Sequence, residues 1–112
     1  MGLEELRTLK CVPCEGGVPK LTPDEAQGFL KQVQGWTLDG DRIRKTMTFK
    51  DFVRAMAFLN EVAKVAEEEG HHPDFSLHSW NKVDFTISTH AIGGLSRNDF
   101  ILAAKIDSLA AA

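Results

Sequence analysis

The stretch DFVRAMAFLNEVAKVAEEEG at residues 51–70 decides the fold that we expect for this chain. Its apolar residues, from Phe52 to Ala66, recur at spacings of three and four, as they do on one face of an α-helix. Gly70 follows them and is a typical helix stop. The pattern therefore predicts one long amphipathic helix over residues 51–69, in the middle of the chain.

Strand patterns lie on both sides of this helix. Before it, residues 36–49 hold two short runs of apolar and β-branched residues around the turn-forming DGD, which predicts a hairpin. After it, DFSLHSW at residues 74–80 and VDFTIST at residues 83–89 predict a second hairpin with alternating apolar and polar side chains. A two-residue loop would set Leu77 beside Thr86, so a longer loop or a bulge fits this hairpin better.

A further helix is predicted at each end of the domain. Thr22 and Glu25 form an N-terminal capping pattern, and we expect the helix that follows to end at Gly35. The closing helix starts after Ser96, with Asp99 three residues on as a capping acid.

The resulting order, α-β-β-α-β-β-α, indicates an α+β fold in which a four-stranded antiparallel sheet carries about three helices on one face. We expect this domain to span residues 21–112, after a weakly ordered extension at residues 1–20 that mixes glycines and prolines. An open sheet leaves edges that a second copy of the chain can pair with, so a homo-oligomer is expected.

The composition argues against several classes of partner. Charged residues make up 26% of the chain and the net charge is -3, which leaves no broad basic field for nucleic acid. No apolar run approaches the roughly 20 residues that span a bilayer, and MGLEELRTLK lacks a signal peptide's apolar stretch, so a cytoplasmic location is expected. Cys11 and Cys14 are too few for a disulfide framework, and a redox pair, half a zinc site and an inert extension all stay open.

Histidines gather where the central helix and the last strand end, at His71, His72 and His90. Because histidine both takes and gives a proton near neutral pH, such a group suits a reaction that moves protons at two atoms of one substrate. Glu67 lies four residues before His71, near enough to bond its imidazole and select its tautomer. The competing interpretation is that these histidines are on the surface by chance.

Metal binding and other common chemistries find less support. Three histidines could hold zinc, but the adjacent His71 and His72 cannot both face one ion from a regular helix or strand, so no metal is expected. The motifs for acyl, phosphoryl and hydride transfer are absent as well. Glu68 and Glu69 are expected to form only a solvated acidic turn.

The spacing of seven residues resembles the signature of the pterin-4a-carbinolamine dehydratases. These residues are Glu67, His71, His72, Pro73, Trp80, His90 and Asp99. The segments FKDF, NKV, STH and GLS are similar to that family too, and the resemblance runs from about Leu21 to the closing helix.

The resemblance implies a lyase that eliminates water from 4a-hydroxytetrahydropterin to give quinonoid dihydropterin, which supports tetrahydropterin recycling. It implies no metal or organic cofactor, and a homodimer or homotetramer. His71 and His90 are then the proton-transfer residues, His72 holds the pterin, and Glu67 orients the adjacent histidines.

The resemblance also implies which residues surround the substrate. Those implied to contact the pterin are His71, His72, Pro73, Ser88, Thr89 and His90. Asp99 is expected to support the site while capping the closing helix, and Trp80 either supports the site or fills the core.

Two alternatives stay open. Animal relatives are also dimerisation partners of a homeodomain transcription factor, and similar proteins assist Rubisco assembly, so the chain could be a non-catalytic dimerisation or assembly-factor module of the same fold. The retention of His71, His72 and His90 favours catalysis. A zinc hydrolase is the second alternative.

Overall fold

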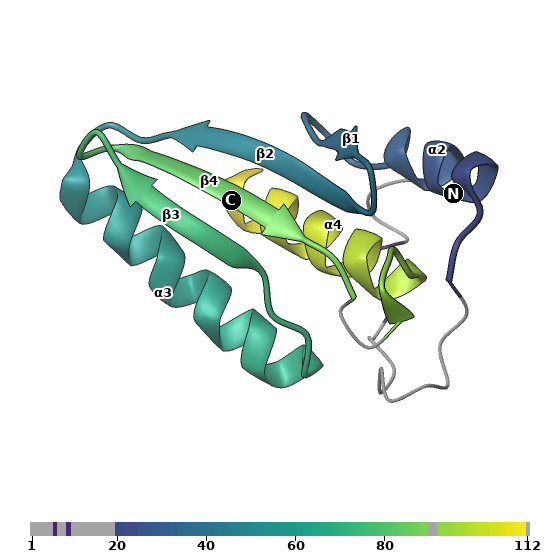
Figure 1. Ribbon diagram of the computed structural model, residues 1–112. Helices are drawn as coiled ribbons and strands as arrows, with labels where there is room; N and C mark the ends of the chain where they lie inside the picture. Colours follow the sequence, from purple (N-terminus) through teal and green to yellow (C-terminus); the bar gives the residue numbers. More distant parts are fainter. Residues whose placement is uncertain (1–5, 7–8, 10–19, 90–91, 112) are drawn as a thin grey trace.

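The computed structural model describes residues 6, 9, 20–89 and 92–111, without the side chain of Ala111. Helices and strands follow one another along these residues in the predicted order (Figure 1). Their bounds are α2 Pro23–Leu30, β1 Thr37–Asp39, β2 Arg42–Thr48, α3 Phe52–Glu69, β3 Asp74–His78, β4 Lys82–Ile87 and α4 Arg97–Ala111. No helix of the described chain is long and apolar enough to cross a membrane.

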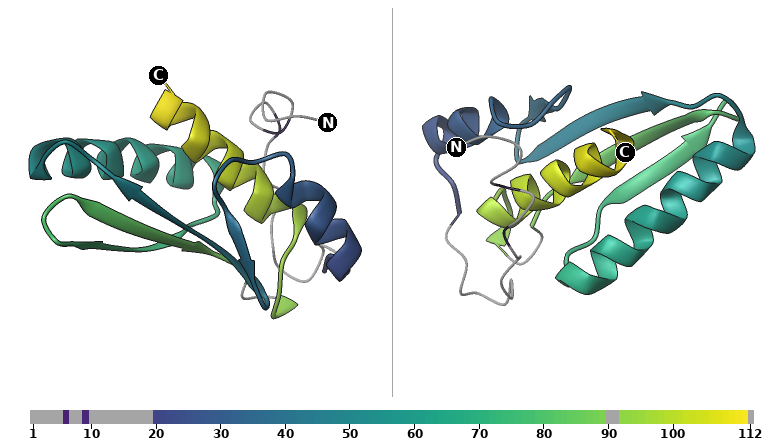
Figure 2. Two further views of the ribbon diagram at one scale, coloured as in Figure 1. Left: turned by 90° about the horizontal axis from the view of Figure 1, so that it is seen from above. Right: turned by 180° about the vertical axis from the view of Figure 1, so that it is seen from behind.

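The four strands form one antiparallel sheet in the order β1-β2-β4-β3, so β1 and β3 are its edges. α3 and α4 lie in contact over one face of this sheet, while α2 lies at the β1 end and contacts α4 (Figure 2). The predicted α+β architecture is thus confirmed, and the opposite face of the sheet carries none of the described helices.

The register of the second hairpin follows from its loop. Residues 79–81 form the connection, three residues rather than two, so Leu77 pairs with Val83 and two apolar side chains face the helices together. Ser79 and Trp80 reach this turn with φ of 51° and 58°, a left-handed conformation uncommon for residues other than glycine. The longer loop expected from the alternation pattern is therefore present.

The core lies between the sheet and the helices. Val83, Phe85 and Ile87 of β4 are fully buried, as the central position of that strand requires. α4 is buried on most of its circumference, and even its polar residues Asn98, Asp99 and Asp107 lie inside the domain. Its fully buried apolar residues are Phe100, Ile101, Leu102, Ala103, Ala104 and Ile106.

The first helix is shorter than the sequence predicts. The capping box at Thr22 and Glu25 is present, but α2 ends at Leu30 rather than at Gly35. After Leu30 the N–H groups of Gln32 and Val33 donate to carbonyls three residues earlier, so the chain continues in tight turns instead of helix.

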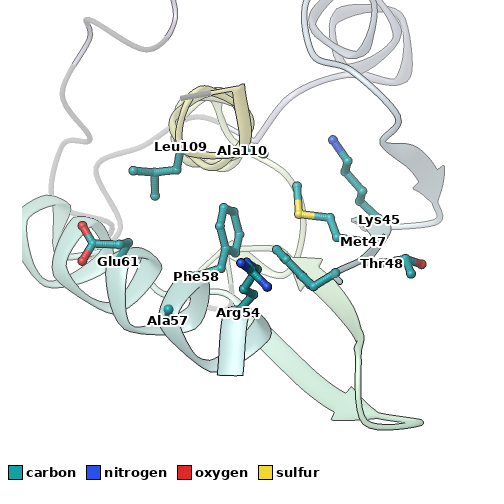
Figure 3. A pocket seen from close by; sticks show the side chains of 10 residues that line it. Lys45, Met47, Thr48, Arg54, Ala57, Phe58, Glu61, Leu109 and Ala110 are labelled. Atoms are coloured by element: carbon teal, nitrogen blue, oxygen red, sulfur yellow. The ribbon is translucent and has the colours of Figure 1, made fainter. Parts of the chain in front are cut away.

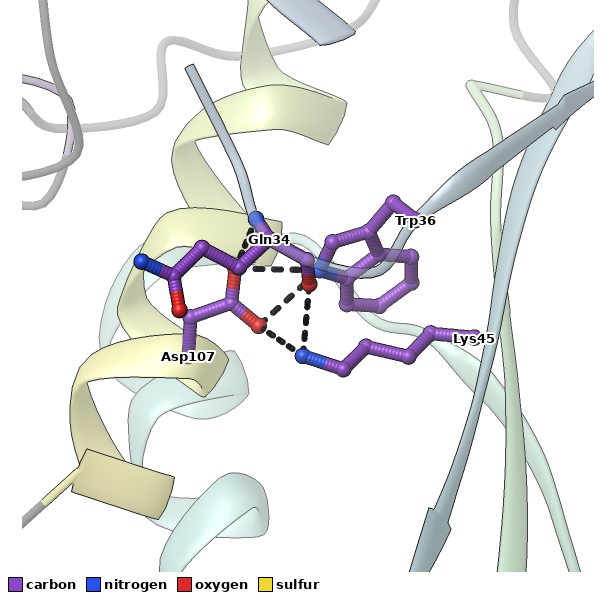
Figure 4. A network of polar contacts seen from close by, with 4 residues as sticks. All are labelled: Gln34, Trp36, Lys45 and Asp107. Carbon is purple, nitrogen blue, oxygen red and sulfur yellow. Dashed lines mark hydrogen bonds and ion pairs between the residues drawn. The ribbon is translucent and has the colours of Figure 1, made fainter. Parts of the chain in front are cut away.

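A buried carboxylate ties α4 to the first strands (Figure 4). Asp107 accepts hydrogen bonds from the Trp36 indole at 3.0 Å, the Gln34 backbone N–H at 3.0 Å and the Lys45 ammonium at 2.7 Å. Because the charge of Asp107 is compensated by Lys45, it can be buried inside the domain without an isolated charge.

The extension predicted at residues 1–20 falls almost wholly outside the described residues, and so do Cys11 and Cys14. Leu6 is fully buried and Leu9 packs against the core. The weak order of this extension, the domain boundary at residue 21 and the role of the cysteines stay predictions.

Candidate active site

The junction between α3 and β3 brings the candidate site together. Gly70 ends α3 in the left-handed conformation, with φ of 64°, and the N–H of His71 donates back to the carbonyl of Ala66 at 3.2 Å. This reversal directs His71 into the protein, where it is buried, and leaves the next residue, His72, exposed on the surface.

His71 contacts a buried carboxylate from α4, 28 residues further along the chain. Its Nε2 lies 2.7 Å from Oδ1 of Asp99, which stands in the first turn of α4 and has no exposed surface. The other oxygen of Asp99 accepts from the Ser96 N–H at 2.8 Å and from the Thr89 hydroxyl at 2.9 Å. Asp99 therefore caps α4, as the sequence predicts, and holds the imidazole at the same time.

His72 has a carboxylate partner of its own. Its Nε2 lies 2.5 Å from Oε2 of Glu67, and both side chains are exposed. The sequence had predicted that Glu67 bonds His71 at helical four-residue spacing, and that prediction is wrong. The helix stops before His71, and the left-handed Gly70 turns the chain so that the following histidine meets Glu67 instead.

The two pairs define the same tautomer in both rings. An ionised carboxylate only accepts hydrogen bonds, so Nε2 of His71 and of His72 carries the hydrogen. In its neutral form each ring then has its basic lone pair on Nδ1. Two adjacent histidines thus have fixed orientation and fixed donor and acceptor atoms, which is what general acid–base catalysis requires.

A groove adjoins His72. It has a volume of about 460 Å³ and runs between α3 and β3, with Glu67, His72 and Pro73 among its lining residues. Met56, Asn60 and Phe75 line it as well, and the sequence did not single them out. Their spacing gave no signal, because only the fold shows that β3 lies beside α3.

A second cavity of about 590 Å³ lies between β2, α3 and the end of α4 (Figure 3). Lys45, Arg54 and Glu61 reach it over an apolar floor, but each has a partner of opposite charge in the fold. None of the predicted site residues lines this cavity.

Other predicted residues fall in different places. Thr89 is buried beside Asp99 and Ser88 is half-buried next to it, whereas His90 lies outside the described residues. Trp80 is 62% exposed in the β3–β4 loop, so it does not fill the core. The length of β3, about 16 Å, separates Trp80 from the histidine junction.

The structure also bears on the predictions for the acidic turn at the end of α3 and for metal binding. Glu69 is not solvated as predicted, because its side chain is only 3% exposed and lies 3.7 Å from the Lys105 ammonium. His78 pairs with Asp84 at 3.0 Å on the open face of the sheet, away from the site. Within the described part of the chain no three histidine, cysteine or acidic side chains are grouped as metal ligands.

Comparison with known proteins decides the family. The family model described as pterin 4 alpha carbinolamine dehydratase matches residues 19–109. The chain belongs to this family. Relatives in this family are named pterin-4-alpha-carbinolamine dehydratase, a lyase that dehydrates a pterin carbinolamine. The chain is an enzyme of this type.

Individual relatives support the assignment over nearly the whole chain. A protein of Nitrosomonas eutropha named "Putative pterin-4-alpha-carbinolamine dehydratase" is 52% identical over 106 residues, which cover 94% of this chain and 93% of the relative. "Pterin-4-alpha-carbinolamine dehydratase 2, mitochondrial" of Arabidopsis thaliana is 46% identical over 112 residues, covering 96% of this chain and 60% of the plant protein.

Solved structures share the fold. The transcriptional coactivator/pterin dehydratase from Brucella melitensis superposes with a TM-score of 0.77 at 33% identity, covering 82% of this chain and 99% of that one. A pterin dehydratase-like protein described as a RuBisCO assembly factor of the alpha-carboxysome has a TM-score of 0.56 at 24% identity, covering 69% and 88%. At that identity the second likeness concerns the fold alone.

Proposed function

We propose that this chain dehydrates 4a-hydroxytetrahydropterin to quinonoid dihydropterin by histidine acid–base catalysis. The observation that carries the proposal is the pair of adjacent imidazoles, each oriented by its own carboxylate: His71 by Asp99 and His72 by Glu67. Family membership supplies the substrate class, and the two pairs supply groups able to give and take protons.

The reaction asks for two proton movements. The bond between carbon 4a and its hydroxyl oxygen breaks, and a general acid protonates that oxygen so that it leaves as water. A general base removes the proton from nitrogen 5, whose electrons form the new double bond to carbon 4a. No electrons enter or leave overall, so no redox partner is needed.

The residues divide these tasks. His71 and His90 transfer protons, and His72 holds the pterin at the end of the groove, with Pro73 beside it. Asp99 keeps His71 in one tautomer and one orientation. Glu67 orients His72 in the same way at the surface, where both side chains are exposed.

Buried hydroxyls complete the support of His71. Thr89 and Ser96 are hydrogen-bonded to each other at 2.9 Å, and Asp99 accepts one bond from the Thr89 hydroxyl and one from the Ser96 backbone. Asp99 thus has fixed donors on its second oxygen, which leaves the first oxygen directed at His71. Ser88 and Thr89 approach the substrate through the end of β4.

We propose that the chain forms a homo-oligomer, because its sheet has an open edge. β3 is an edge strand with unpaired backbone groups, and Phe75 on it is exposed beside the exposed Met56 of α3. A second copy of the chain would cover such a surface, so we expect a homodimer or homotetramer. Two further statements also stay predictions: that the physiological role is tetrahydropterin recycling, and that the protein is cytosolic.

A non-catalytic module of the same fold is the second candidate function. The exposed apolar side chains along α3 and β3 favour it as an interaction surface. A kinetic assay separates the two candidates: purified protein is added to chemically generated 4a-hydroxytetrahydropterin, and quinonoid dihydropterin is followed by absorbance. Acceleration over the uncatalysed rate supports the enzyme, and an unchanged rate supports the module.

A further inference from the structure

Two polar contacts are among those between the end of α3 and α4. One is the catalytic pair, in which His71, two residues beyond α3, meets Asp99 in the first turn of α4. The other is the ion pair between Glu69, the last residue of α3, and Lys105 in the middle of α4, at 3.7 Å. The proposed reaction uses the first contact and gives no role to the second.

The Glu69–Lys105 ion pair is far more buried than the Lys64–Glu61 pair of α3. The side chains of Glu69 and Lys105 are only 3% and 18% exposed, whereas those of Lys64 and Glu61, also on α3, are 70% and 52% exposed. Water screens an exposed pair almost completely, but a pair in the low-dielectric interior keeps most of its attraction. The Glu69–Lys105 pair can therefore hold α3 against α4, whereas the exposed Lys64–Glu61 pair lies within α3.

The two contacts together fix how α4 lies on α3. Asp99 and Lys105 are six residues apart, which is about 9 Å along a helix. Apolar packing between the helices is non-directional and resists small sliding or rotation weakly. Two polar contacts separated by about 9 Å resist both movements.

We propose that Lys105 is a positioning residue for the active site: through its ion pair with Glu69 it fixes the end of α3 against α4 and so maintains the contact between His71 and Asp99. The inference rests on the proposed function for its catalytic consequence, but the contact itself can be observed without turnover. Neither residue belongs to the family signature quoted from the sequence.

The test compares Lys105→Met with Lys64→Met, which breaks the exposed pair of α3 and serves as the matched control. Because displacement of a reacting group by about 1 Å can cost roughly 100-fold, we expect Lys105→Met to lower kcat at least about tenfold with KM within about twofold. The Nε2 proton of His71 should lose its downfield NMR signal, and Lys105→Arg should restore both. Lys64→Met should change neither.

One outcome overturns the inference: Lys105→Met that keeps the His71 signal and wild-type kcat, whether or not its melting temperature falls. If this variant does not fold, because buried Glu69 loses the positive charge of Lys105, the neutral double variant Glu69→Gln, Lys105→Gln replaces it. The double variant should show the same weakened signal and lowered kcat, and wild-type values would again refute the proposal. A wild-type enzyme without dehydratase activity would refute the proposed function, while the NMR signal would still test Lys105.

Discussion

His71 Nε2 and Asp99 Oδ1 lie 2.7 Å apart although 28 residues separate them in the sequence, and both side chains are buried. The contact joins the loop after α3 to the first turn of α4. It gives one of the proposed proton-transfer residues a fixed tautomer and a fixed orientation.

The first prediction concerns this contact. Asp99→Asn should lower kcat at least about tenfold, because the amide holds the imidazole in place poorly and presents an N–H where the ring needs an acceptor. Steady-state kinetics measures the loss. Asp84→Asn is the control, since Asp84 pairs with His78 outside the site, and its kcat should stay at the wild-type value. Equal kcat values for both variants would remove Asp99 from the site.

Glu67 provides a second prediction. Glu67→Gln removes the anionic partner that orients His72, the residue proposed to hold the pterin, so KM should rise. The melting temperature should not fall, because the variant also removes a negative charge from the last turn of α3, next to Glu68 and Glu69. Steady-state kinetics and thermal melting measure both effects, and a lower melting temperature with an unchanged KM would make Glu67 a structural residue only.

The turn that delivers His71 is the subject of the third prediction. Gly70→Ala should destabilise the protein by about 1 kcal/mol, roughly 4–8 °C in melting temperature, because φ of 64° strains any residue with a Cβ. No atom lies within 4 Å of the added methyl group, so the cost is that of the backbone alone. Gly28→Ala is the matched control, since Gly28 lies within α2 and its replacement should stabilise by about 0.5–1 kcal/mol. Thermal melting distinguishes the two, and equal shifts would contradict the assignment of Gly70 as the helix stop.

A fourth prediction follows from the open face of the sheet. The hydrogen bond from the Thr46 hydroxyl, aided by His78, holds the pKa of Asp84 below its usual range. Since the pKa is lower in the folded than in the unfolded state, Asp84 stabilises the fold above about pH 4, and this contribution is lost as the pH falls through the lower, folded pKa. The melting temperature of Asp84→Asn should therefore be below that of wild type at pH 7, and the difference should shrink toward zero at strongly acid pH. A difference of the same size at both pH values would refute the linkage.

Local patterns accounted for much of the fold. The spacing of apolar residues in α3 and the alternation in β4 placed these elements, and the capping box at Thr22 placed the start of α2. The order of elements was enough to predict the sheet with helices on one face, because each element has one apolar side to bury. The end of α2 was missed, since no residue before Gly35 breaks a helix by itself.

Less of the site than of the fold could be predicted from the sequence. Adjacent histidines and the family signature identified His71 and His72, but the choice of partner for Glu67 depended on the backbone direction at Gly70. The burial of Glu69 depended on α4 lying beside α3, a contact between segments more than 30 residues apart. Such pairings follow from tertiary packing and leave no local periodicity.

The central claim is that histidines carry the dehydration, and one comparison tests it most directly. Turnover of chemically generated 4a-hydroxytetrahydropterin is measured for His71→Ala, His90→Ala and His72→Ala, with His78→Ala as the control on the open face of the sheet. The account predicts that His71→Ala and His90→Ala each lose about two to four orders of magnitude in kcat, that His72→Ala mainly raises KM, and that His78→Ala is unchanged. Wild-type kinetics in all of the first three variants would contradict it.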